Sequence, residues 1–275
     1  MPIIYEPKGR AREYSPYACN LYIGCSHRCQ YCYAPHALQR SAGNYFGIPS
    51  PRKGVLKYLE ADLRNQKYDK QILLSFIGDV YCENTDNSQA TREALKLFNL
   101  YRAPVAVLSK GGERMLKDMD IFKEFGESIS VGATLTFFDE AKSNEWESGA
   151  ASPAERCKVL KEIHNQGVKT FASFEPVIEP FESLRLIEQT LSDDSVDHYK
   201  IGKLNNYKGL DRGIDWQGFL SDALAMIRPA KKQIYIKEDL RASAPGIQLY
   251  EDEADPERYI VKISVSYTHL RAHET

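Results

Sequence analysis

The sequence predicts an α/β fold in which an open parallel sheet forms a partial (β/α)6 barrel of the TIM type. Seven short runs rich in β-branched and apolar residues are expected to be buried strands, and longer stretches with helical spacing lie between them. Strands that are apolar throughout are typical of a parallel sheet covered by helices. So few units favour an open barrel over a closed eight-fold one, and a doubly wound sheet is the alternative.

The expected strands share an apolar interior and precede loops with polar or charged residues. They span residues 19–24, 71–78, 104–109, 129–137, 168–174, 196–202 and 233–238. In folds of this kind, functional groups gather where the parallel strands end. The loops after these strands are therefore where we expect the chemistry.

The expected helices have apolar residues three and four positions apart. They span residues 88–102, 152–167, 181–193 and 215–230. The second of them begins with Ser152 and Pro153, a favourable N-cap and first turn, and ends at Gly167. No repeat or linker interrupts the pattern, which predicts one domain over residues 1–262.

Length and composition indicate a soluble protein. The chain has 275 residues, of which 43% are hydrophobic and 27% charged, and no apolar run approaches the roughly 20 residues of a membrane span. Its start lacks the layout of a secretory signal, so we expect a cytoplasmic location. The last residues, 263–275, resemble translated adaptor sequence and are set aside as a tail that does not look native.

The formal net charge of −2 is unevenly distributed. Residues 1–70 hold 11 Lys and Arg against 5 Asp and Glu. Six of these basic residues are expected within one helical stretch: Arg52, Lys53, Lys57, Arg64, Lys67 and Lys70. A basic face could attract a phosphate-bearing substrate, and the alternative is an ordinary solvated surface.

Three cysteines, Cys25, Cys29 and Cys32, follow the first expected strand with the spacing C-x3-C-x2-C. Thiolates this close together in a loop can bind neighbouring corners of a small iron–sulfur cluster. A [4Fe–4S] cube held by three protein ligands leaves one iron open for a small molecule. The shortage of a fourth cysteine therefore favours a catalytic cluster.

The cysteines have three alternative interpretations. A structural zinc site needs four ligands, and the fourth would have to come from a residue such as His36 or Cys82, since His27 is poorly placed between two cysteines. An electron-transfer ferredoxin binds each cluster through four cysteines. Buried free thiols are common singly but do not explain three in eight residues.

The string "NLYIGCSHRCQYCYAP", with Tyr31 directly before the last cysteine, resembles the radical S-adenosylmethionine (radical SAM) superfamily. The fuller pattern resembles its spore photoproduct lyase-like, or DNA repair photolyase-like, branch from about residue 15 to about residue 240. The resemblance implies that Cys25, Cys29 and Cys32 bind three irons of a [4Fe–4S] cluster while SAM binds the fourth. It also implies that Tyr31 packs near the adenine, although Tyr31 could simply pack the loop.

The resemblance also places SAM contacts at the strand ends. Gly78 and Asp79 would accept hydrogen bonds from the SAM ammonium, although an ordinary turn explains them equally. Ser109 and Lys110 match the family's strand-end pair, with Lys110 on the SAM carboxylate. Thr134 would face the ribose.

Two further residues, Glu147 and Arg156, match an acidic and a basic position in the family and are expected as SAM contacts, although Arg156 could equally be a solvated helix residue. The chain departs from spore photoproduct lyase in having Ile77 and Gly78 where that family carries a cysteine that donates hydrogen. Cys82 is then the candidate donor, or else a buried free thiol.

Tyr33 is an alternative hydrogen donor. Glu175, at a Pro-rich strand end, faces either the site or solvent.

The resemblance implies a radical SAM enzyme that reductively cleaves SAM to a 5′-deoxyadenosyl radical and takes hydrogen from a substrate. A nucleic-acid lesion is one substrate, and a tRNA base, a peptide or a small metabolite is the alternative. We expect a reductant such as flavodoxin or ferredoxin as partner and no membrane. A zinc- or cluster-stabilised nucleic-acid-binding module is the hypothesis from a different class, and the net charge of −2 argues against it.

Overall fold

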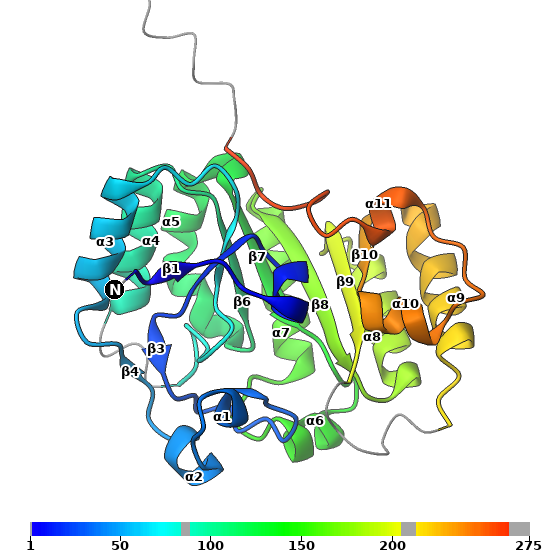
Figure 1. The fold of residues 1–275 in the computed structure, drawn as a ribbon. Coiled ribbons are helices and arrows are strands. Elements are labelled where there is room, and N and C mark those ends of the chain that lie inside the picture. The colour runs from blue at the N-terminus through cyan, green and yellow to red at the C-terminus, as the bar shows by residue number, and fades with distance from the viewer. Residues whose placement is uncertain (1, 84–88, 205–212, 264–275) are drawn as a thin grey trace, which may run out of the picture.

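An eight-stranded sheet forms the centre of the computed structural model, which describes residues 2–83, 89–204 and 213–263 (Figure 1). Its order is β1-β2-β5-β6-β7-β8-β9-β10; β1 is antiparallel to β2, and the other neighbours are parallel. The strands are β1 (Ile4–Tyr5), β2 (Tyr17–Cys19), β5 (Ile72–Leu74), β6 (Val105–Ser109), β7 (Ile129–Thr134), β8 (Lys169–Val177), β9 (His198–Lys203) and β10 (Gln233–Ile236). The predicted open parallel α/β sheet is thus confirmed. Seven of its strands run parallel, one more than in a (β/α)6 barrel.

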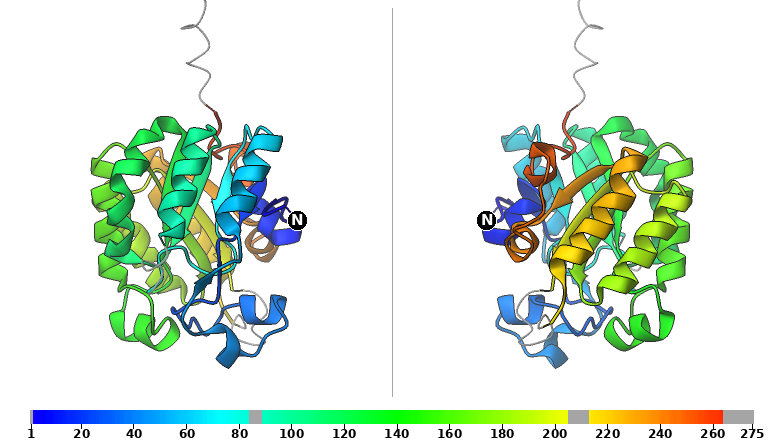
Figure 2. Two further views of the ribbon diagram at one scale, coloured as in Figure 1. Left: turned by 90° about the vertical axis from the view of Figure 1, so that its left-hand side faces the viewer. Right: turned by 90° about the vertical axis from the view of Figure 1, so that its right-hand side faces the viewer.

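Helices lie mainly on the outer side of this sheet, while the N-terminal segment crosses the other side (Figures 1 and 2). The outer layer contains α3 (Val55–Asn65), α4 (Ala90–Leu100), α5 (Met119–Glu124), α7 (Pro153–Asn165), α8 (Pro180–Ser192) and α9 (Trp216–Ile227). Shorter helices are α1 (Ala34–Ala37), α2 (Ala42–Tyr45), α6 (Glu140–Trp146), α10 (Glu238–Ser243) and α11 (Glu251–Ala254), with the 3-10 turns η1 (Gly9–Glu13), η3 (Gly112–Asp118), η4 (Gly126–Ser128) and η5 (Arg228–Ala230).

The apolar core lies between the sheet and these outer helices. One cluster joins α3, α4 and α5 to the first half of the sheet, and a second joins α8 and α9 to the second half. The inner face of the sheet carries a much smaller apolar cluster, formed by Tyr14, Ala18, Leu73, Ala106 and Phe171. The curved inner side is therefore left for polar side chains and a cavity.

Local sequence signals explain where the helices begin. The Ser152 side chain accepts a hydrogen bond from the Glu155 N–H at the start of α7, and Pro153 occupies the first turn, as predicted. Asp215 caps α9 in the same way through the Gly218 N–H. Each expected helix is present, and the ends differ from the prediction by one to three residues.

The first strand differs from the prediction of residues 19–24. The sheet strand β2 ends at Cys19, and Tyr22–Ile23 (β3) pairs antiparallel with β4 (Ser50–Pro51) in a separate two-stranded sheet. The reason is Asn20, whose side-chain oxygen accepts the backbone N–H groups of Phe76 and Ile77, each at 3.0 Å. These bonds turn the chain out of the sheet and also end the strand expected over 71–78 at Leu74.

The basic stretch 52–70 is not one helical face, so that expectation is wrong. Only Lys57 and Arg64 of the six basic residues lie on α3, whose buried side faces the core. Lys70 pairs with Glu257 at 2.8 Å. Beyond Ile263, the expected tail lies outside the described residues. No helix in the described part of the chain is long and apolar enough to cross a membrane.

Candidate active site

The loop of residues 24–33, here called the cysteine loop, lies at the edge of the sheet where the parallel strands end (Figure 1). Cys25 and Cys29 are buried, and Cys32 is partly buried. All three line one cavity of about 570 Å³. This volume is within the range of cavities that hold small-molecule ligands. The three thiols predicted to bind one cluster therefore face one space.

A buried histidine holds the cysteine loop in place. The Nε2 atom of His27 lies 2.9 Å from Oδ2 of Asp79, and its Nδ1 atom lies 3.0 Å from the carbonyl oxygen of Gly149. Both partners are acceptors, so the ring satisfies both only when each nitrogen carries a proton. Burial would lower the pKa of His27, but the Asp79 carboxylate outweighs this effect and raises it. His27 thus links the cysteine loop to the segment after β5 and to the connection between α6 and α7.

Asp79 accepts four hydrogen bonds from the protein itself. Besides His27, the donors are the Ser109 hydroxyl at 2.7 Å, the Lys110 N–H at 2.7 Å and the Tyr81 N–H at 2.8 Å. Burial would raise the pKa of Asp79, but the charge of His27 and these bonds outweigh it and hold the pKa below its usual range. Asp79 and Ser109 line the cavity, and their observed contacts position the cysteine loop against β6.

Gly78 occupies a position that requires glycine. Its φ is +76°, and a Cβ atom there would lie 2.8 Å from the carbonyl oxygen of Gly24, at the start of the cysteine loop. Its N–H is bonded to the Tyr45 hydroxyl at 3.1 Å. The close approach of these two segments therefore depends on the missing side chain.

Lys110 and Tyr31 face the cavity beside the cysteines. The Lys110 ammonium lies 5.4 Å from the centre of the Tyr31 ring and 3.9 Å from a carboxylate oxygen of Glu147. The Tyr31 hydroxyl donates to the same carboxylate. Thr134, at the end of β7, lines the cavity next to them. Four residues expected to contact SAM at strand ends, Asp79, Ser109, Lys110 and Thr134, therefore surround one space.

Glu147 and Arg156 lie behind this wall and do not line the cavity. They form a fully buried ion pair at 2.5 Å, and Arg156 also donates to the carbonyl oxygens of Thr134 and Ala151. Burial would raise the pKa of Glu147, but Arg156 and Lys110 outweigh it and lower the pKa. In this arrangement Glu147 accepts a hydrogen bond from Tyr31 and Arg156 donates one to the Thr134 carbonyl, so the two residues expected to contact SAM support the cavity wall from behind.

The two expected hydrogen donors occupy different environments. Cys82 is fully buried, its thiol donates to the Asp79 carbonyl at 3.1 Å and contacts Cys25, and it does not line the cavity. Tyr33 lines the cavity, is half exposed, and donates its hydroxyl to the Phe76 carbonyl at 2.9 Å. Of the two, only Tyr33 faces the space where a substrate would bind.

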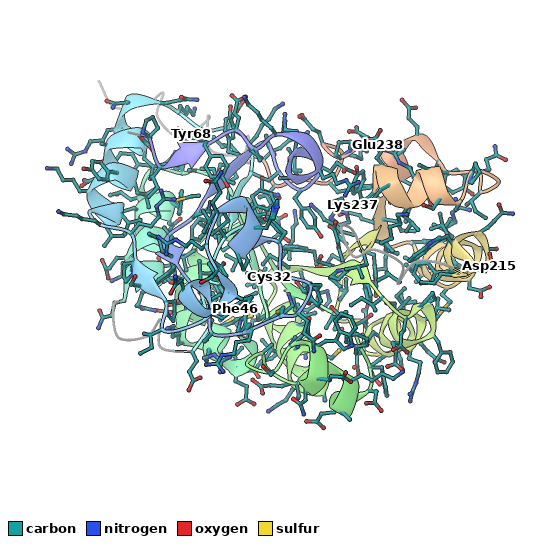
Figure 3. All side chains as sticks on the ribbon, turned by 60° about the horizontal axis from the view of Figure 1, so that its bottom comes forward. Cys32, Phe46, Tyr68, Asp215, Lys237 and Glu238 are labelled. Carbon is teal, nitrogen blue, oxygen red and sulfur yellow. The ribbon has the colours of Figure 1, made fainter. Side chains whose placement is uncertain are left out.

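The cavity has an opposite wall that the prediction largely missed. Glu175 and Lys237 line it, and their side chains pair at 2.7 Å. Figure 3 labels Cys32 and Lys237 on different elements around the same central region. The strand expected over 233–238 would have contained Lys237, whereas β10 ends at Ile236 and leaves Lys237 as the first residue after it.

The cysteine thiols fit a cluster better than a single ion. Within residues 2–83, 89–204 and 213–263, no three His, Cys, Asp or Glu side chains gather around one point as ligands of one ion would. A cubane places a separate iron at each thiolate, so its ligands need to face a common space without meeting at a point. Cys25, Cys29 and Cys32 meet that requirement.

The model of the radical SAM superfamily matches residues 19–193 of the chain. The protein therefore belongs to the radical SAM superfamily, which uses a [4Fe–4S] cluster and SAM. An uncharacterised protein of Methanocaldococcus jannaschii is 32% identical over 162 residues, covering 59% of this chain and 60% of that protein.

Two solved structures share the fold. Spore photoproduct lyase complexed with dinucleoside spore photoproduct has a TM-score of 0.57 at 13% identity, covering 90% of this chain and 66% of that one. Streptococcus suis SuiB bound to precursor peptide SuiA has a TM-score of 0.59 at 14% identity, covering 85% and 52%. The chain thus spans half to two thirds of the length of these proteins. At these identities the likeness shows the fold alone.

Proposed function

We propose that the protein is a radical SAM enzyme in which Cys25, Cys29 and Cys32 hold the cluster and the strand ends beside them hold SAM. The observation that carries this proposal is the shared cavity of the three thiols and Lys110. When bound, the two cofactors together supply a radical that takes hydrogen from the substrate. The protein binds and orients them within the cavity.

The residues around the cavity support distinct tasks. The Lys110 ammonium, held near Tyr31 and Glu147, would bind the SAM carboxylate through a charge-assisted hydrogen bond. Gly78 would offer its backbone to the SAM ammonium. Asp79 contributes negative charge to the same region, and its contact with the ammonium would add to its four existing bonds. Thr134 would face the ribose.

Anaerobic reconstitution with iron and sulfide tests the proposal. We expect close to four irons per chain, broad absorption in the blue, and formation of 5′-deoxyadenosine from SAM in the presence of a reductant such as flavodoxin or ferredoxin. Replacing Cys25, Cys29 or Cys32 by Ala should abolish all three. Cys19→Ala and Cys157→Ala are matched controls because both thiols are buried away from the cavity. Stoichiometric zinc that survives reconstitution would contradict the proposal.

For the substrate we propose a nucleic-acid lesion, with peptide, tRNA or small-metabolite modification as the second candidate. Among the described residues, the cavity is lined by more cations than carboxylates, which supports a phosphate-bearing substrate. The position of Cys82 behind Cys25 argues against a cysteine that returns hydrogen, so we assign that role to Tyr33. Incubation with dinucleoside spore photoproduct should yield repaired dinucleotide from the wild type and altered products from Tyr33→Phe. Unchanged photoproduct, with 5′-deoxyadenosine still formed, would favour the second candidate.

A further inference from the structure

Three residues form a row across the ends of three neighbouring strands. Glu175 lies on β8, Gly202 on β9 and Lys237 directly after β10, and the residues before them, Phe174, Ile201 and Ile236, are paired in register. A Cβ atom on Gly202 would lie 2.8 Å from Lys237 Cδ and 3.3 Å from Glu175 Cδ. The Glu175–Lys237 ion pair therefore crosses directly over the glycine and fills the space that a side chain would take.

Neighbouring residues fix this pair in position. The Lys237 ammonium lies 5.0 Å from the centre of the Tyr14 ring and 3.9 Å from Glu13. The Tyr14 hydroxyl is bonded to the Ser173 hydroxyl at 2.5 Å. The Lys237 side chain is only 3% exposed. The charge of Lys237 is therefore held at the cavity wall and is not free to swing into solvent.

Further cations line the same wall. Lys8 and Arg10 come from the N-terminal segment and Lys203 from the end of β9. Within the described part of the chain, neither Lys8 nor Arg10 has a carboxylate within ion-pair distance, and Glu175 is the one carboxylate lining this wall. Because Lys237 already balances Glu175, Lys8 and Arg10 leave an excess of positive charge facing the cavity.

We propose that Lys8 and Arg10, on this wall, bind an anionic group of the substrate, a phosphate or a carboxylate. The inference rests on the proposed function, since it assigns the cysteine side of the cavity to the cofactors and this side to the substrate. The forked guanidinium of Arg10 suits two-point contact with either anion. The Glu175–Lys237 pair sets the shape of the wall beneath it.

Calorimetric titration of the reconstituted, SAM-loaded protein with inorganic pyrophosphate and, separately, citrate tests the inference. At least one anion should bind, and which of the two binds more tightly identifies phosphate or carboxylate as the preferred group. Arg10→Ala should weaken that binding at least about tenfold, as expected for the loss of one charged hydrogen bond. Arg12→Ala is the matched control, because Arg12 lies two residues away, pairs with Glu257 at 2.7 Å, and does not line the cavity.

Gly202→Ala supplies a second measurement that leaves every charge in place. The added methyl group should displace the ion pair and weaken the same anion several-fold. Wild-type protein that forms 5′-deoxyadenosine yet binds neither anion would overturn this inference and leave the proposed function standing. Equal affinity in Arg10→Ala and Arg12→Ala would overturn it as well. Wild-type protein that forms no 5′-deoxyadenosine would instead overturn the proposed function.

Discussion

His27 and Asp79 form a buried ion pair, 2.9 Å between Nε2 and Oδ2, that joins the cysteine loop to the ends of β5 and β6. His27 lies between Cys25 and Cys29 in the sequence, and Asp79 accepts a hydrogen bond from the Lys110 N–H. The position of the proposed cluster ligands and that of the proposed SAM ligand are therefore mechanically connected.

The first prediction concerns this pair. His27→Ala leaves the Asp79 carboxylate buried without its cationic partner, which should lower the free energy of unfolding of the cluster-free protein by about 3 kcal/mol. Chemical denaturation measures this change, and iron content after reconstitution should fall with it. His164→Ala is the control, because His164 pairs with Asp197 at 3.2 Å on a more exposed surface of α7. Equal effects of the two substitutions would show that His27 has no special role.

The second prediction concerns SAM affinity. Lys110→Ala should weaken SAM binding by roughly ten- to a hundred-fold, because a charged hydrogen bond to the carboxylate is lost. Equilibrium dialysis of the reconstituted protein measures the dissociation constant. Lys123→Ala, which removes an exposed lysine from α5, should leave it unchanged. If Lys110→Ala binds SAM as tightly as wild type, the carboxylate is held elsewhere.

The third prediction concerns the buried pair behind the cavity. Arg156→Met should destabilise the protein by about 3–5 kcal/mol, because it leaves Glu147 charged and buried. The double variant Arg156→Met/Glu147→Leu should recover most of this loss in denaturant unfolding. Lys158→Ala breaks the exposed pair with Glu113 and should cost less than about 1 kcal/mol. No recovery in the double variant would mean that packing, and not charge, dominates at this position.

The fourth prediction concerns Lys200, which is buried on β9 with its ammonium 3.0 Å from the Tyr14 carbonyl. Burial and then the nearby charge of Lys237 lower its pKa to about 7, against the opposing effect of Glu175. The unfolded chain keeps this proton up to about pH 10.4, so between these values unfolding takes up a proton and stability rises with pH.

Lys200→Met lacks this proton uptake. Between pH 7.5 and 9.5, the free energy of unfolding of the wild type should therefore rise relative to that of Lys200→Met by about 1.4 kcal/mol per pH unit. Denaturant unfolding of the cluster-free proteins at several pH values measures the difference. Parallel curves for the two proteins would contradict the lowered pKa.

The sheet and the three cysteines proposed as cluster ligands could be predicted because both follow from local sequence patterns. Apolar runs identify strands, and a three-cysteine spacing needs no tertiary information. Lys110, directly after β6, and Asp79, in the segment that follows β5, could also be placed, since the ends of parallel strands share one edge. The first strand was misplaced because the bonds that end it come from Asn20 to a segment more than fifty residues later.

The rest of the site depends on contacts that local patterns do not contain. Glu147 and Arg156 were expected at the cavity, yet their side chains pair with each other behind it. The row of Glu175, Gly202 and Lys237 forms only because three neighbouring strands lie in register. Cys82 lies near the proposed cluster ligands, but its thiol packs behind Cys25, and only side-chain geometry distinguishes that position from one facing the cavity.

The hydrogen bonds that hold the cysteine loop have a consequence for biosynthesis. Gly149 exchanges hydrogen bonds with His27 in both directions, and the Gln30 N–H is bonded to the Trp146 carbonyl at 2.8 Å. These partners are translated more than a hundred residues after the cysteines, and contacts so distant along the chain form late in folding. The thiols therefore emerge from the ribosome well before the loop has its final shape. Iron and sulfide delivered to the nascent chain would meet three cysteines that are not yet held in place by these contacts. We therefore expect the cluster to be inserted after the sheet has formed.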